Sequence, residues 1–124
     1  MDFKIELVFV PVTDVDRARG FYENQLGWNV DHDVTVSPEL RFVQVTPPGS
    51  ACSIAFGVGI AGHMAPGSQR SVQLVIDDAE AARDMLRSNG VDATDVDEQA
   101  WGRFVTFDDP DGNRWTLQQM PVRD

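Results

Sequence analysis

An internal repeat constrains the fold of this chain more than any other feature of its sequence. The stretch VFVPVTDVDRARGFYENQLG (residues 8–27) returns as VQLVIDDAEAARDMLRSNG (residues 72–90), at an offset of 72 − 8 = 64. Each stretch has a strand composition, then an aspartate typical of a helix start, an amphipathic segment and a glycine stop. RFVQVTPPG (residues 41–49) is likewise matched by RFVTFDDPDG (residues 103–112). The repeat predicts two copies of one module, and places function where the two copies face each other.

The pattern predicts the same element order, β-α-β-β-β, in both copies. Strand compositions occur at residues 3–12, 28–33, 41–46 and 51–57, and helices begin near Asp14 and Asp78. A glycine-rich stretch separates the copies. We therefore expect an α+β fold in one domain spanning residues 1–124, with a first module at 1–57, a linker at 58–69 and a second module at 70–120.

Composition excludes several function classes. The chain has 20 acidic and 10 basic residues and a net charge of −10, which argues against binding to nucleic acid or to an anionic membrane surface. Cys52 is the single cysteine, so no internal disulfide can form. With neither a signal-peptide pattern nor a long apolar run, these features predict a cytoplasmic protein.

Two motifs carry a family resemblance. PVTDVDRARGFYENQLGW (residues 11–28), followed by FDDPDGNRWTLQQ (residues 107–119), resembles the vicinal oxygen chelate superfamily. That superfamily includes glyoxalase I, bleomycin resistance proteins and extradiol dioxygenases. The resemblance implies two β-α-β-β-β modules whose curved mixed sheets surround a ligand cavity, usually in a homodimer.

The resemblance also implies four metal-ligand positions. Enzymes of the superfamily use His or Gln, Glu, His and Glu, and the matching positions here are Leu7, Ser53, Ser71 and Thr116, with Ala55 replacing Ser53 if the register shifts by two residues. Alkyl and hydroxyl side chains do not hold a transition metal. We therefore predict no metal and no cofactor, and so no metal to stabilise an enediolate.

Other candidates for metal binding or nucleophilic catalysis are weak. His63 lies in the linker, and His32 lies between Asp31 and Asp33, whose side chains would alternate between faces in a regular strand. Neither histidine has a serine or cysteine at an interpretable spacing. Cys52 lies in the apolar run ACSIAF and is expected to be a small buried hydrophobe.

Strand alternation predicts the ligand-binding face instead. Residues two apart share a face, and the predicted face combines apolar and neutral hydrogen-bonding groups, as small-molecule sites do. Trp101 follows an acidic loop and is predicted at the edge, where its indole can stack on a ligand. The predicted ligand-binding residues are Leu7, Phe9, Ser53, Ser71, Gln73, Trp101, Arg114, Thr116 and Gln118.

Three functions fit this sequence. The first is a binding protein of the bleomycin-resistance type that sequesters a drug or metabolite, with the acidic charge suiting a cationic or planar molecule. The alternative is a metal-independent or atypical lyase, isomerase or dioxygenase-like enzyme, which requires a general base in the cavity. The third is a structural or regulatory module with a vestigial pocket. The sequence leaves open whether the protein is catalytic and whether the modules pair within one chain or across a dimer.

Overall fold

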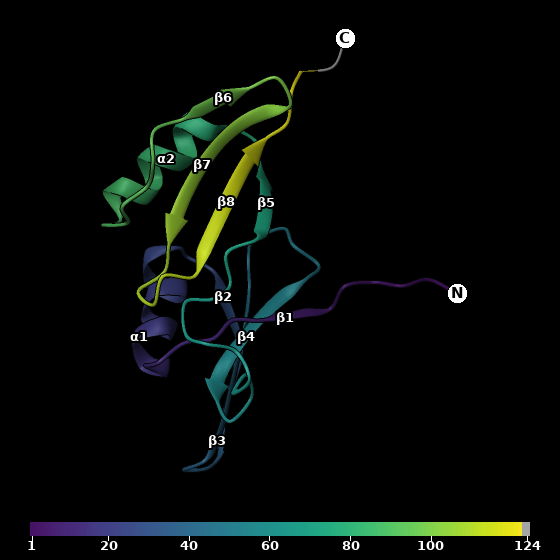
Figure 1. The fold of residues 1–124 in the computed structure, drawn as a ribbon, viewed down its shortest axis with the longest axis vertical. Coiled ribbons are helices and arrows are strands. Elements are labelled where there is room, and N and C mark those ends of the chain that lie inside the picture. The colour runs from purple at the N-terminus through teal and green to yellow at the C-terminus, as the bar shows by residue number, and fades with distance from the viewer. Residues whose placement is uncertain (123–124) are drawn as a thin grey trace.

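The computed structural model describes residues 1–122 and folds each repeat into a four-stranded sheet with one helical segment (Figure 1). In the first module, α1 continues directly into η1, a π-helical turn. Its elements are β1 (Leu7–Phe9), α1 (Val15–Gly20), η1 (Phe21–Gln25), β2 (Asn29–Ser37), β3 (Leu40–Thr46) and β4 (Ser53–Val58). The second contains β5 (Val72–Ile76), α2 (Ala79–Ser88), β6 (Asp97–Gln99), β7 (Gly102–Asp108) and β8 (Arg114–Gln119). The predicted α+β class and the β-α-β-β-β order are confirmed.

The helices begin at the predicted capping residues. The Asp14 carboxylate accepts a hydrogen bond from the Arg17 N–H at 3.0 Å, and Asp78 accepts one from the Ala81 N–H at 3.1 Å. Gly27 and Gly90 follow the two helical segments with φ of 73° and 82°, a conformation that favours glycine. None of the helices within residues 1–122 is long and apolar enough to cross a membrane.

The two sheets have equivalent strand orders, β1-β4-β3-β2 and β5-β8-β7-β6. Phe9 pairs with Ala55 in the first sheet, and Gln73 pairs with Thr116 in the second. Because the repeat makes Phe9 equivalent to Gln73 (9 + 64 = 73), Ala55 is the equivalent of Thr116. Of the two registers considered from the sequence, the structure therefore selects the one with Ala55 at the metal-ligand position.

Each sheet has one buried face and one open face. The buried faces and the helices share a core to which both modules contribute, including Tyr22, Val43, Leu86 and Trp115. The open faces carry exposed side chains such as Phe9 and Val75, the latter 68% exposed. In Figure 1 the two modules lie one above the other instead of face to face. One chain alone therefore leaves both sheet faces accessible.

Candidate functional site

A buried polar network, here called the tie, joins the two modules beside the core. The Tyr22 hydroxyl donates to Asp109 Oδ2 at 2.7 Å and accepts from Trp115 Nε1 at 3.0 Å. Asn113 Nδ2 donates both to Asp109 Oδ2 and to the Pro11 carbonyl, each at 2.8 Å. The N–H groups of Asp111 and Asn113 donate to Asp109 Oδ1 at 2.9 Å. Four donors therefore surround one buried carboxylate.

The tie is structural and does not act as a general base. Burial, followed by the nearby negative charge of Asp109, raises the pKa of Tyr22 well above its usual value, so the hydroxyl keeps its proton. The acceptor sites of Asp109 are used by the donors just described and face the core. The Asp-Pro-Asp-Gly segment has the composition of an ordinary turn. Its network partners are distant in sequence, with 87 residues between Tyr22 and Asp109 and 102 between Pro11 and Asn113, so local spacing does not identify them.

The open face of the first sheet carries a row of neighbouring side chains. Strand pairing places Phe9, Ala55, Gln44 and His32 side by side across β1, β4, β3 and β2. Ser53, one row away beside Leu7, lies within hydrogen-bond distance of the Thr46 hydroxyl at 2.6 Å. Leu7, Phe9 and Ser53 thus share one face, as strand alternation predicts.

The strand alternation expected around His32 is wrong. A bulge in β2 between Val30 and His32 interrupts the two-residue period. Asp31 accepts from the Thr46 hydroxyl, and His32 pairs with Gln44, two residues from Thr46 on the same face. Asp31 and His32 therefore share the open face. Even so, no group of three or more His, Cys, Asp or Glu side chains suited to a metal ion occurs among the residues described.

The two remaining candidates, His63 and Cys52, are unremarkable in their surroundings. His63 is exposed in the turns after β4, within the predicted linker. Cys52 is half-buried, not fully buried, because it lies in the bend before β4, where its Sγ donates to the Ser53 carbonyl at 3.5 Å.

The open face of the second sheet holds most of the predicted ligand-binding residues. Gln73 pairs with Thr116, and Gln118 lies two residues further along β8 on the same face. The Gln118 amide donates to the Trp101 carbonyl at 3.0 Å, next to an indole that is 63% exposed at the β6–β7 turn. Ser71 lies exposed just before β5. These residues form a neutral polar surface with one aromatic side chain at its edge.

Arg114 is not a free cation on this face. Its guanidinium donates to both carboxylate oxygens of Asp108, at 2.8 and 3.2 Å. This pairing raises the pKa of Arg114 above its ordinary value. An anionic ligand would have to compete with Asp108, so the second face favours neutral or cationic molecules.

The structure therefore assembles the nine predicted residues into two groups. Leu7, Phe9 and Ser53 belong to the first sheet, whereas Ser71, Gln73, Trp101, Arg114, Thr116 and Gln118 belong to or adjoin the second. Within one chain these groups do not meet.

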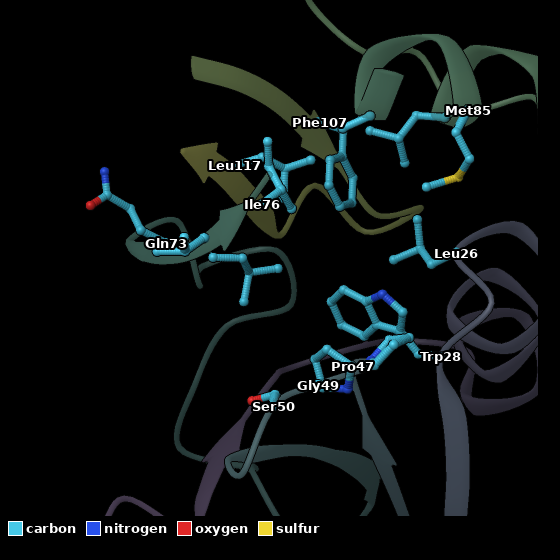
Figure 2. A pocket seen from close by; sticks show the side chains of 15 residues that line it. Leu26, Trp28, Pro47, Gly49, Ser50, Gln73, Ile76, Met85, Phe107 and Leu117 are labelled. Atoms are coloured by element: carbon cyan, nitrogen blue, oxygen red, sulfur yellow. The ribbon is translucent and has the colours of Figure 1, made fainter. Parts of the chain in front are cut away.

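A groove with a volume of about 480 Å³ lies between the modules, at the edge of β5 (Figure 2). Apolar side chains dominate its lining, among them Leu26, Trp28, Ile76, Met85, Phe107 and Leu117. Gln73 is the single member of the predicted ligand-binding set that lines this groove. Sequence reasoning missed the groove because its walls come from both modules, and its apolar residues, such as Leu26, Phe107 and Leu117, fit ordinary core positions.

The fold defines a class: proteins built from two β-α-β-β-β modules with open, curved sheet faces. The chain belongs to the Glyoxalase/Bleomycin resistance protein/Dioxygenase superfamily, whose profile matches residues 4–117.

Similar structures and sequences cover nearly the whole chain. TnmS3, described as an antibiotic binding protein from Streptomyces sp. CB03234, is 32% identical with a TM-score of 0.87, over 97% of this chain and 98% of its own. A glyoxalase/bleomycin resistance protein from the same Streptomyces is 34% identical with a TM-score of 0.81, over 94% and 100%. YetH of Bacillus subtilis (strain 168) is 27% identical over 120 residues, 94% of this chain and 98% of its own.

Proposed function

We propose that this protein binds and sequesters a small organic molecule on its open sheet faces, without the metal ion of superfamily enzymes. The observation that carries the proposal is the set of side chains at the four metal-ligand positions of the superfamily. Leu7, Ala55, Ser71 and Thr116 offer no imidazole and no carboxylate there. The likeness to TnmS3, an antibiotic binding protein, supports a binding role over a catalytic one.

The chemistry of the second face suggests a planar, neutral or cationic ligand. Gln73, Thr116 and Gln118 supply neutral hydrogen bonds, each contributing about 1 kcal/mol net. Contact with Trp101 and neighbouring apolar surface then supplies most of the affinity, at about 25 cal/mol per Å². The net charge of −10 attracts cations. These contributions correspond to an affinity of roughly micromolar strength.

The proposal includes a cytoplasmic homodimer. Each open face, with Phe9 exposed on the first sheet and Val75 on the second, binds a small molecule weakly, because one wall leaves half of the ligand in water. A second copy can supply the other wall by placing its first sheet against the second sheet of its partner. This arrangement would unite Leu7, Phe9 and Ser53 of one chain with Gln73, Thr116 and Gln118 of the other.

A metal-independent lyase, isomerase or dioxygenase-like enzyme is the second candidate. One observation favours it: the β2 bulge puts the His32 imidazole on the open face beside the Asp31 carboxylate. An imidazole in that position can accept a proton from a ligand bound on this face, as a general base does. If a binding ligand is chemically converted by the wild type and not by His32→Gln, the sequestering function is wrong and the enzyme is right.

A ligand screen tests both the function and the location. A panel of antibiotics and metabolites is screened by tryptophan fluorescence, and hits are measured by calorimetry. We expect Trp101→Ala to weaken binding by about 1–3 kcal/mol, as for a central aromatic anchor, and Gln73→Ala to weaken it by about 1 kcal/mol. Met85→Ala, in the groove and away from both faces, is the matched control. Because Gln73 also lines the groove, the comparison of Trp101→Ala with Met85→Ala decides the location. Wild-type affinity in Trp101→Ala together with a loss in Met85→Ala would move the site to the groove.

A further inference from the structure

A chain of hydrogen bonds crosses the open face of the first sheet, from β2 to β4. Asn29 Nδ2 donates to Asp31 Oδ1 at 2.8 Å, and the Thr46 hydroxyl donates to Asp31 Oδ2. The hydroxyl oxygens of Thr46 and Ser53 lie 2.6 Å apart. Both oxygens of one carboxylate are therefore held in place, one by a residue of the same strand and the other by a residue of β3.

The direction of these hydrogen bonds follows from the carboxylate. An ionised carboxylate only accepts hydrogen bonds, so the single hydroxyl proton of Thr46 points at Asp31. Ser53 must then donate its own proton to the Thr46 oxygen. The remaining lone pairs of Asp31 and those of Ser53 receive no other donor within residues 1–122. We call Asp31, Thr46 and Ser53 the acceptor row, because they offer a ligand acceptors and no donor.

The acceptor row reaches solvent at Asp31. Its side chain is exposed, whereas Ser53 is 5% exposed and lies between Leu7 and Thr46 at the floor of the open face. Among residues 1–122, no Lys, Arg or His side chain forms an ion pair with Asp31. A carboxylate that is held through both oxygens and has no positive partner is preorganised to receive a cation.

The equivalent place in the second sheet is occupied by an ion pair. By the repeat, Thr46 corresponds to Asp108 (46 + 62 = 108), and Ser53 corresponds to Arg114 (53 + 61 = 114, the offset between the last metal-ligand positions of the two modules). Asp108 and Arg114 neutralise each other, whereas Thr46 and Ser53 are uncharged and connect to Asp31. The first face therefore keeps one uncompensated negative charge at a place where the second face has none.

We propose that Asp31 is a specificity-determining residue that receives a protonated amine of the bound molecule, with Thr46 and Ser53 as its positioning residues. An ammonium group carries donors and a positive charge, which matches a row of acceptors that carries one negative charge. A carbonyl or carboxylate oxygen at the same place would meet acceptors only and be rejected. The apolar remainder of the ligand lies toward Leu7 and Phe9, across the sheet on β1.

Three matched probes test this inference, which rests on the small-molecule binding proposed above and adds the group that the protein selects. Naphthylethylamine, naphthylethanol and naphthylacetate share an aromatic body and carry a cation, a neutral hydroxyl and an anion at neutral pH. Their binding to the full chain is measured by calorimetry. We expect the amine to bind about tenfold more tightly than the alcohol, because a hydrogen bond to a charged group contributes more than a neutral one, and the acetate to show no binding.

Three variants assign the preference to the acceptor row. Asp31→Asn should bring the affinities of amine and alcohol within about twofold of each other. Thr46→Val keeps the side-chain shape, and should lower the amine affinity about threefold while leaving that of the alcohol unchanged. Asp33→Asn is the matched control, since it removes the same charge from the same strand, but Asp33 is paired with Arg19 and Arg41. It should keep the tenfold preference, and circular dichroism establishes that every variant is folded.

The outcomes separate this inference from the proposed function. An amine preference that survives in Asp31→Asn would overturn the inference and leave small-molecule binding intact. Equal binding of amine and alcohol by the wild type would also overturn it. So would an equal loss of preference in Asp33→Asn and Asp31→Asn, because net charge alone would then attract the amine. If no probe binds the wild type at millimolar concentration, the inference is overturned, and the antibiotic and metabolite screen decides the proposed function separately.

Discussion

The tie predicts a large stability loss from removing a single oxygen atom. Tyr22→Phe keeps the ring, whose centroid lies 5.4 Å from that of Trp28 and 5.5 Å from that of Phe56, so packing is retained. Two groups lose their partner: Asp109 Oδ2 loses one of its two donors, and Trp115 Nε1–H is left in the core without an acceptor. A hydrogen bond to a charged group contributes about 1.5–3 kcal/mol, and a buried unsatisfied N–H costs about 1–3 kcal/mol. We expect a total loss of about 3 kcal/mol.

Urea unfolding followed by tryptophan fluorescence measures this loss. With a slope of about 2 kcal/mol per M, typical of a small domain, the midpoint should fall by about 1.5 M at unchanged slope. Thr13→Val is the contrast, since it removes the exposed hydrogen bond from the Thr13 hydroxyl to Asp111 at the same junction and should cost about 0.5–1 kcal/mol. If Tyr22→Phe costs no more than Thr13→Val, the tie does not hold the modules together and the reasoning is refuted.

Three further predictions concern stability and metal content. Hydrogen bonds first from Arg41 and then from Arg19 lower the pKa of Asp33 from 3.8 to about 2. The stabilisation of the fold by the ionised Asp33 carboxylate is therefore complete above pH 4 and lost as the pH falls through 2. Asp33→Asn should therefore lower the unfolding free energy by about 1–2 kcal/mol at pH 7, and a difference that persists below pH 2 would contradict this. Gly57→Ala should destabilise by about 3 kcal/mol, because its Cβ would lie 1.8 Å from the Arg41 carbonyl oxygen, while Gly62→Ala, with nothing within 4 Å, should be neutral in the same urea titration. Elemental analysis after chelation and reloading with Zn²⁺ or Ni²⁺ should find no stoichiometric metal, and one tightly held ion per chain would refute the assignment of Leu7, Ser71 and Thr116.

The sequence predicts the order of the elements well because the repeat contains each one twice. It predicts their bounds less well, since the strand expected over residues 3–12 forms only at Leu7–Phe9 and the strand expected over residues 28–33 continues to Ser37. Strand, cap, helix and glycine stop recur in order, so an ambiguous signal in one copy is supported by the other. The β2 bulge was not predictable in this way, since it has no counterpart in the three-residue β6. The extra residue of the bulge places Asp31 on the same face as His32, which strand alternation does not predict.

Of the candidate site, the sequence predicted only which residues share one face of a strand. Alternation grouped Gln73, Thr116 and Gln118 correctly, because residues two apart share a face on a regular strand. It could not show that Arg114 is paired with Asp108, that Asp109 is buried against Tyr22, or that a groove opens along β5. Each of these depends on how the two modules pack, and packing depends on side-chain shape across long sequence separations.

The tie and the groove occupy equivalent junctions between the two modules, in each of which the helix of one module meets the loop between the last two strands of the other. By the repeat, Tyr22 corresponds to Leu86 (22 + 64 = 86) and Asp109 to Pro47 (109 − 62 = 47), and both counterparts line the groove. Duplication of a module makes two equivalent junctions between the copies. In this chain one junction is closed by buried hydrogen bonds, and the other is an open groove. A chain with Tyr and Asp at both junctions would have no open groove, and a chain with Leu and Pro at both would lack the buried hydrogen bonds that join its two modules.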